Sequence, residues 1–255
     1  MLMEVGVVLS GALALVLFLL FWSTYKEYSD IRRYRQNIST SANWSVWQEK
    51  DFESWRNQLP CMEGREVSLF VVLGSGGHTA EMIQILQAFG RHGLDSFCVH
   101  GKVTYIVASS DPHSMVRARC LHEKNGVLAS YSYQFLVIPR SRYVGQSYFS
   151  SIFSTSYSLV VSWWKIIVGT EAPDILLCNG PGTCVPIVLI TFVRNVVHRL
   201  LQKRRTRIVF IESVARVHSL SLSGRILYPL AHRFLVQWPE LRDKYPRVEY
   251  IGLCL

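Results

Sequence analysis

Two glycine-rich turns carry the residue types in this sequence that are best suited to hold a phosphate. The first, Gly74-Ser75-Gly76-Gly77-His78-Thr79, separates an apolar run from a segment with helical spacing. Its glycines would let the backbone approach an anion closely, at the N–H groups that begin the helix. His78 could donate to a phosphate oxygen or act as a general acid or base, and Thr79 could cap the helix or donate its hydroxyl. The alternative is a plain tight connection between a strand and a helix.

The second turn, Asn179 to Thr183, is also glycine-rich and also precedes a helical pattern. Gly180 and Gly182 shape the loop, and Thr183 is a good N-cap for the apolar helix that follows. If both turns lie at one edge of a sheet, they line one cleft, to which Asn179 also contributes. Otherwise they are two unrelated tight turns.

Glu212 ends the apolar run 207–211 and is the third candidate. A carboxylate at that point is costly unless it faces a cleft or has a partner. It is therefore either a general base or ligand-binding group, or one half of an ion pair with Arg216, four residues later on a helix.

Short apolar runs alternate with helical patterns from residue 66 onward. This alternation predicts an α/β domain with a parallel, doubly wound sheet, in which ligands bind beyond the carboxyl ends of the strands. The serine-rich apolar segment 149–169 is either a buried crossover helix or a helix at a membrane interface. The predicted strands are 67–73, 103–108, 133–138, 174–178, 207–212, 233–237 and 248–252, and the predicted helices are 79–91, 113–123, 149–169, 183–201 and 219–231.

The N-terminal region predicts a membrane anchor. Residues 5–22 form an uncharged apolar run of about the length that spans a bilayer, and a cleaved signal peptide is the alternative. The basic residues follow the run, which places residues 1–4 in a lumen and the rest in the cytosol. Residues 23–65 are then a juxtamembrane linker and 66–255 the cytosolic domain. The sequons at Asn37 and Asn43 should stay unglycosylated.

Composition and charge indicate which classes of partner and ligand the chain can bind. The net charge of +9 suits an anionic membrane surface or a phosphate-bearing ligand. No basic stripe interleaved with aromatic residues and no helix-turn-helix pattern point to nucleic acid. The six cysteines lack metal-ligand spacing, so we expect no metal, no cofactor and reduced thiols.

Motif spacing weighs against several enzyme classes. The chain has no G-x-x-x-x-G-K-[ST] and no G-x-S-x-G sequence. A nicotinamide-dinucleotide oxidoreductase remains an alternative, with Asp111 as a ribose ligand. However, Thr79 occupies the place of the last glycine in its fingerprint, and no tyrosine is followed by lysine four residues later.

Five segments together carry a family resemblance: GSGGHTAEM, IPRSRYVGQS, LCNGPGTCVP, the run from IVFIESVAR to FLVQWPEL, and KYP. Over roughly residues 66–252 they resemble, in colinear order, the membrane-anchoring subunits of the bipartite UDP-N-acetylglucosamine transferase of the dolichol pathway. The resemblance implies the acceptor-side half of a two-domain (GT-B) glycosyltransferase, whose donor-binding half is a separate cytosolic protein. The preceding GlcNAc-phosphate transferase of the pathway is a further candidate partner.

The resemblance also implies a reaction and a location. The complex would add the second N-acetylglucosamine to GlcNAc-diphosphodolichol at the cytosolic face of the endoplasmic reticulum. Glu212 is the first candidate for the base and His78 the second, and the first turn would bind the acceptor phosphates. The tail Gly252-Leu253-Cys254-Leu255 would dock the donor subunit. The alternative is a non-catalytic scaffold that only recruits its partner.

Overall fold

Seven parallel strands form one sheet in the computed structural model, which describes residues 15–33, 66–91, 101–123, 128–141, 145–180 and 182–253. The strand order is β3-β2-β1-β4-β5-β6-β7. The strands are β1 (Val67–Leu73), β2 (Gly101–Ala108), β3 (Ser132–Ile138), β4 (Ile175–Asn179), β5 (Arg207–Ile211), β6 (Arg233–Val236) and β7 (Glu249–Tyr250).

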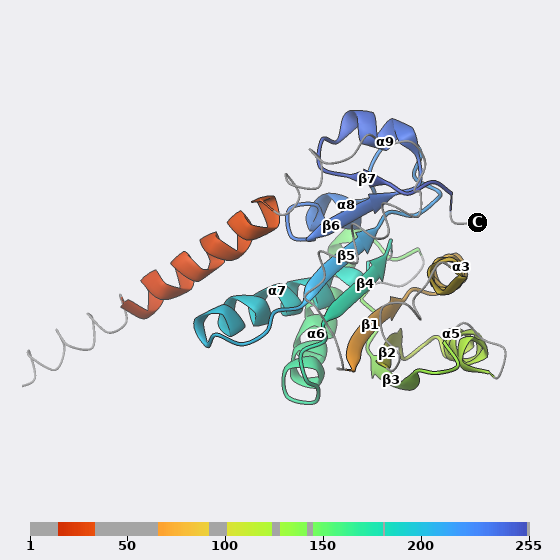
Figure 1. Cartoon of the computed structure of the whole chain (residues 1–255), viewed down its shortest axis with the longest axis horizontal. Helices are drawn as coiled ribbons and strands as arrows, with labels where there is room; N and C mark the ends of the chain where they lie inside the picture. The colour runs from red at the N-terminus through yellow and green to blue at the C-terminus, as the bar shows by residue number, and fades with distance from the viewer. Residues whose placement is uncertain are drawn as a thin grey trace, which may run out of the picture.

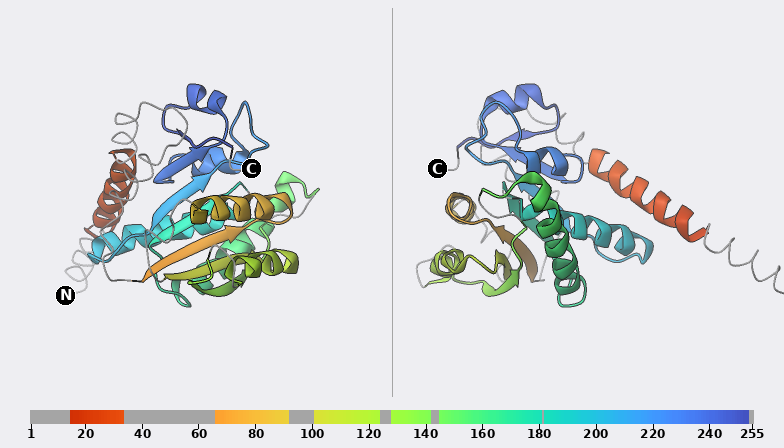
Figure 2. Two further views of the ribbon diagram at one scale, coloured as in Figure 1. Left: turned by 45° about the vertical axis from the view of Figure 1, so that its right-hand side comes forward. Right: turned by 180° about the vertical axis from the view of Figure 1, so that it is seen from behind.

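Helices cover both faces of this sheet, so the predicted doubly wound α/β fold is confirmed (Figure 1). Helices α3 and α5 pack on one face, and α6 and α7 pack on the other (Figures 1 and 2). The helical segments are α3 (Gly77–Arg91), α5 (Pro112–Arg119), the 3-10 turn η1 (Cys120–His122), α6 (Tyr148–Ile167), α7 (Cys184–Leu200), α8 (Leu222–Leu227) and α9 (Pro239–Lys244).

Alternation along the central strands builds two cores. In β1, Phe70 and Val72 point to the α6–α7 layer, while Val71 and Leu73 point to the α3–α5 layer. Because both faces are buried, β1 is a continuous apolar run, as expected for a central parallel strand.

The sequence predicted both ends of every strand to within two residues, but two helical segments differ. The helix expected over 219–231 is confined to α8, because Ser221 caps it and the chain turns after Leu227 to enter β6. Helix α9 was not predicted, because six residues that start with a proline are too few to show helical spacing.

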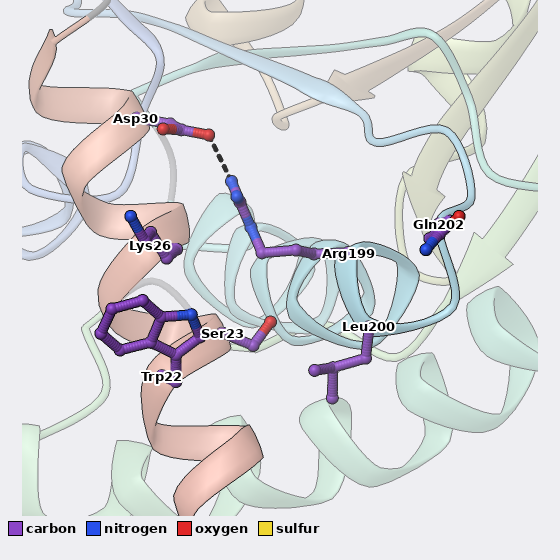
Figure 3. A pocket seen from close by; sticks show the side chains of 7 residues that line it. All are labelled: Trp22, Ser23, Lys26, Asp30, Arg199, Leu200 and Gln202. Atoms are coloured by element: carbon purple, nitrogen blue, oxygen red, sulfur yellow. Dashed lines mark hydrogen bonds and ion pairs between the residues drawn. The ribbon is translucent and has the colours of Figure 1, made fainter.

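Residues 15–33 form a helix that docks against α7 through its second half. The Ser23 hydroxyl donates to the Val196 carbonyl over 2.8 Å. Glu27 is fully buried and accepts hydrogen bonds from Arg199 and Arg205, and Asp30 binds both arginines as well. A pocket of about 480 Å³ lies beside this junction, lined by Trp22, Ser23, Lys26, Asp30, Arg199, Leu200 and Gln202 (Figure 3).

The first half of this helix projects away from the domain (Figure 1). Every residue from Leu15 to Trp22 is at least 38% exposed although all eight are apolar. Among the described residues, no helix combines the length and the apolar character that crossing a bilayer requires. Residues 1–14 and 34–65, which hold the start of the predicted anchor, both sequons and most of the predicted linker, lie outside the described residues.

Candidate functional site

The two glycine turns meet at the point where the strand order reverses. β1 and β4 are neighbours in the sheet, and the chain runs outward from them in opposite directions. Ligands of open α/β sheets bind at the carboxyl end of such a switch point. The turn after β1 and the turn after β4 both lie there, so the prediction that they share one edge is confirmed.

Contact between the turns is direct. Gly180 has a φ of +53°, and a Cβ on it would lie 2.7 Å from Cε1 of His78. A side chain at position 180 would therefore push the imidazole out of place. Glycine is required there both for the backbone conformation and for the close approach of the two turns.

The first turn offers free backbone donors to an anion. Gly76 adopts a φ of +64°, and Gly77 starts the 15-residue helix α3. The first turn of any helix leaves N–H groups without intrahelical partners, and the helix dipole adds a partial positive charge there. Both glycines are exposed, so an anion can reach these groups.

Arg140 adds a full positive charge to the first turn, and it was not predicted as a site residue. It follows β3 and donates from Nη2 to the Ser75 hydroxyl over 2.7 Å. The side chain thus reaches across the carboxyl ends of β2 and β1. The signal was its place in the segment IPRSR, directly after a predicted strand.

Thr79 stabilises the first turn from its buried side. Its buried hydroxyl contacts the Gly74 carbonyl and the Ser114 hydroxyl, and Ser114 in turn binds Asp111. These bonds fasten the turn to the start of α5. In this conformation neither Thr79 nor Asp111 presents its side chain to the exposed side of the turn.

Glu81 lies at the centre of the site and was also missed. It is 6% exposed, and its carboxylate accepts hydrogen bonds from the Val214 amide, Gln237 and the Ser213 hydroxyl. Burial alone would raise the pKa of Glu81, but the nearby His78 and the hydrogen bonds from Val214 and Gln237 together lower it below its ordinary value. Glu81 is therefore an anion at neutral pH that joins α3 to the ends of β5 and β6.

His78 sits against this anion. Its Nδ1 atom lies 3.8 Å from Oε2 of Glu81, and the side chain is 37% exposed. A carboxylate at Nδ1 favours the tautomer that carries its proton there, which leaves Nε2 to accept a proton. The spacing of three residues between His78 and Glu81 on α3 was the signal for this pair.

Asn179 completes the group at the end of β4. It is 1% exposed, and neither atom of its side-chain amide has a hydrogen-bond partner in the described structure. Nδ1 of His78 also lacks one, since Glu81 is beyond hydrogen-bond distance. Buried polar groups are rarely left unpaired, so this junction has spare donors and acceptors for a ligand or water.

The rest of the second turn shapes the start of α7. Thr183 is the N-cap residue, but its side chain makes no capping hydrogen bond. A Cβ on Gly182 would meet no atom within 4 Å, so this glycine lies in open space. Thr183 is buried, and a role for either residue in substrate binding stays a prediction.

Glu212 faces the interior rather than the glycine turns. It is fully buried, and it accepts hydrogen bonds from the backbone amides of Ser213 and Ser221 and from the Ser221 hydroxyl. Burial raises its pKa, although the Ser221 amide opposes the shift. A Cβ on Gly224 would lie 2.2 Å from Oε2, which shows how closely the carboxylate is enclosed. These contacts favour a structural role that holds the loop 212–221 in place.

Arg216 does not form the helical pair that its spacing suggested. The segment after β5 is a loop, and the Arg216 side chain is exposed. None of the ion pairs of the described residues joins it to Glu212. A pair between residues four apart requires a helix over both of them. The next helix, α8, begins only at Leu222, six residues after Arg216, so this interpretation was wrong.

We expect Glu212→Gln to lower the free energy of unfolding by about 1–3 kcal/mol, because the glutamine NH₂ group cannot accept the hydrogen bonds from Ser221. Turnover by the folded protein should stay near the wild-type rate. Thermal unfolding and a transferase assay measure the two effects. Glu240→Gln, an exposed substitution on α9, is the control. An unchanged melting temperature with lost turnover would restore Glu212 as the base.

The described residues contain no cluster of three or more His, Cys, Asp and Glu side chains that could hold a metal ion. The pocket at the N-terminal helix lies away from the glycine turns, at the end of α7 (Figure 3). The donors at the switch point are backbone amides, Arg140, Asn179 and His78, and this set suits a phosphate-bearing ligand.

Comparisons with known proteins agree with a site for a phosphate-bearing ligand. A Candida albicans protein named UDP-N-acetylglucosamine transferase subunit ALG14 is 44% identical over 193 residues, which cover 75% of this chain and 80% of the relative. Proteins of the same name from Rattus norvegicus and Homo sapiens are 38% and 35% identical, over 76% and 73% of this chain and 85% and 82% of their own lengths. No solved structure shows a significant match. Residues 69–254 match the family described as "Oligosaccharide biosynthesis protein Alg14 like", and the chain belongs to this family.

Proposed function

We propose that this chain is a subunit of a UDP-N-acetylglucosamine transferase. The observation that carries the proposal is the identity to relatives of that name over about four fifths of their length. Nothing in the family or in these names supports the oxidoreductase alternative. The strand order is shared with dinucleotide-binding folds, so the sheet alone does not separate the two classes.

The chain supplies the acceptor side of the transfer site. Its glycine turn, the α3 N-terminus and Arg140 suit the diphosphate of a lipid-linked acceptor, GlcNAc-diphosphodolichol. The sheet is then one lobe of a GT-B enzyme, and a separate cytosolic subunit brings UDP-N-acetylglucosamine. The preceding GlcNAc-phosphate transferase is a second candidate partner.

The position of His78 beside Glu81 supports a mechanism of general base catalysis. An acceptor hydroxyl attacks the anomeric carbon of the donor sugar, and the bond from that carbon to UDP breaks. His78 receives the hydroxyl proton at Nε2, and the Glu81 carboxylate stabilises the imidazolium that forms. Glu212 is buried and holds the loop 212–221 in place through its hydrogen bonds to Ser213 and Ser221.

The N-terminal helix supports a position at the membrane. Its exposed half, from Leu15 to Trp22, is apolar on every side, as a lipid-facing helix would be. We place the anchor over residues 5–22 in the endoplasmic reticulum membrane, with a short lumenal N-terminus and the sheet in the cytosol, where UDP-sugars are present.

A transferase assay with UDP-N-acetylglucosamine and the lipid acceptor tests this function. The chain alone should be inactive, and activity should appear when a candidate donor subunit is added. Full activity without a partner would contradict the two-subunit proposal. Full activity of the complex after replacement of His78 would instead support a non-catalytic scaffold.

The C-terminal tail gives a separate prediction about the partner. β7 is a two-residue edge strand, and after it Gly252 turns with a φ of +75° and Leu253 is 52% exposed. Cys254 and Leu255 lie outside the described residues. An apolar tail beside an open sheet edge can add to a partner. Deleting Gly252 to Leu255 should therefore reduce the amount of donor subunit that co-purifies.

The deletion should leave the fold intact, so the melting temperature of the truncated chain is the control. Recovery of the partner at the wild-type level would show that the tail is not the docking element.

A further inference from the structure

Helix α6 presents a stripe of large apolar side chains outward, while its inner face combines serines with core residues such as Ile166. Ser158 and Ser162 are fully buried against the domain. The outer stripe recurs every three or four residues, as one face of a helix does. Its members, each 64–75% exposed, are Phe149, Phe153, Tyr157, Val160, Trp164 and Val168.

An apolar stripe on the outer side is unexpected for a helix whose outer side faces water. Burying one large apolar side chain is favourable by about 1.5–3 kcal/mol. Covering a row of exposed apolar side chains would therefore release a large amount of free energy. Isolated exposed apolar residues are ordinary, but a continuous patch marks a surface that meets a partner or a membrane. Aromatic side chains dominate the stripe, and Trp and Tyr are enriched at the level of lipid headgroups.

Charge around the stripe also favours a bilayer. Neither α6 nor α7 contains an acidic residue, and Glu171, in the loop after α6, lies beside Arg194. Of the basic residues that follow α7, Lys203 is exposed, whereas Arg204 pairs with Asp174 and Arg205 pairs with Glu27 and Asp30. Anionic lipids attract an exposed lysine next to an apolar face.

Helix α7 connects α6 to the N-terminal helix. Arg194 of α7 donates to the carbonyls of Ile166 and Thr170 at the end of α6, which fixes α6 to α7. At the other side of α7, Trp22 and Leu200 line one pocket (Figure 3). Between them the outer side of α7 exposes further apolar side chains, namely Val193, Val197, Leu200 and Leu201.

All three helices lie on one side of the sheet, opposite α3 and α5 (Figures 1 and 2). A bilayer that received the N-terminal helix would therefore face α6 and not α5. This arrangement distinguishes a membrane from a protein partner, which would not have to lie on the same side as the anchor.

The beginning of α6 is also tied to the candidate site. Ser158 donates to the Pro139 carbonyl over 2.9 Å, and Ser154 donates to the Ser141 carbonyl over 2.7 Å. Between these acceptors, Arg140 reaches Ser75 of the glycine turn. A surface that holds α6 thus lies next to the edge of the sheet where the phosphate donors gather.

We infer that the outer face of α6 lies in the headgroup region of the bilayer, as a second membrane contact besides the N-terminal anchor. The two contacts together fix the tilt of the domain. The carboxyl edge of the sheet then stands at the height of a lipid diphosphate, while the lipid chain stays in the membrane. This inference rests on the anchoring proposed above.

The test places an environment-sensitive fluorescent amino acid at position 160 of the full chain, in vesicles of phosphatidylcholine and phosphatidylserine. Val116 on α5 is the matched control, because it is also an exposed valine, 59% against 68%, on the opposite side of the sheet. Doxyl-labelled lipids should quench the probe at 160 about twofold or more and leave the probe at 116 unaffected.

Vesicle flotation of the same samples separates the two proposals. A chain that floats while its probe at 160 stays unquenched retains the anchor and overturns the α6 contact. A chain that does not float overturns both. Equal quenching at both positions, or a blue shift at 160 that needs only the donor subunit or a second copy of the chain, also overturns the α6 contact.

Discussion

His78→Ala should reduce the kcat of the assembled transferase by about 10²- to 10⁴-fold, the usual contribution of a general base. The imidazole is the titratable group that touches both glycine turns, with Gly180 packed against it and Glu81 behind it. The melting temperature and the recovery of the donor subunit should stay unchanged, because the side chain is 37% exposed. Steady-state kinetics with the lipid acceptor measures the effect.

Glu81→Gln tests the anion behind His78 without removing its volume. The glutamine oxygen can still accept from the Val214 amide, and its NH₂ group can donate to the Ser213 hydroxyl. Loss of the charge should lower kcat less than His78→Ala does, and it should change the pH profile of kcat. His198→Ala, in the last turn of α7 at the opposite edge of the sheet, is the control. If Glu81→Gln left the pH profile unaltered, Glu81 would be a structural residue only.

The lowered pKa of Glu81 also predicts a pH dependence of stability. A carboxyl whose pKa is lower in the folded state contributes stability above its unfolded pKa and loses it as the pH falls through the folded value. The wild type should therefore lose more stability than Glu81→Gln on acidification below its ordinary pKa of 4.5. Chemical denaturation at several pH values measures this difference.

The sheet could be predicted from the sequence because its strands are short apolar runs separated by turns and helical patterns. Local signals of this kind do not depend on which elements become neighbours. For the same reason the sequence does not predict spatial neighbours: a strand end such as Asn179 was identified, but the residues that lie beside it depend on the order of strands in space. The two glycine turns were correctly placed together because parallel strands bring their carboxyl ends to one edge.

The roles of the two carboxylates, Glu212 and Glu81, were harder to predict. Glu212 and Glu81 both look like single carboxylates beside an apolar run. The structure buries one against Ser221 and places the other beside His78, and only the tertiary contacts separate these roles. Arg140 was missed for a similar reason, since its reach to Ser75 spans two strands and 65 positions of sequence. Periodicity correctly identified 149–169 as a helix, but the exposure of its aromatic side depends on what it packs against.

Glu27→Ala should release the N-terminal helix from α7 and destabilise this junction by about 2–3 kcal/mol, toward the low end for a broken buried ion pair. Glu27 is fully buried between Arg199 and Arg205, with Nε2 of His232 at 3.7 Å from its other oxygen. Its removal leaves Asp30 to balance both arginines. The arginines are 21% and 32% exposed, so water reduces the cost.

The distance distribution between spin labels at Thr24 and Leu201 reports this docking in the full chain in lipid nanodiscs. It should be narrow in the wild type and broad in Glu27→Ala. Asp30→Asn is the matched control from the same network. Asp30 is 35% exposed, and exposed ion pairs contribute about 0–1 kcal/mol, so its distribution should stay narrow.

Docking of the helix also has a functional consequence. In the membrane position proposed above, the ion pairs of Glu27 would fix the angle between the anchor and the α6 face, and this angle would decide whether the glycine turns meet the lipid diphosphate. Glu27→Ala should therefore raise the KM for a membrane-bound acceptor and leave the KM for a short-chain, water-soluble acceptor unchanged. Equal KM values for the wild type and the variant in the membrane would show that the anchor is a tether of no fixed orientation.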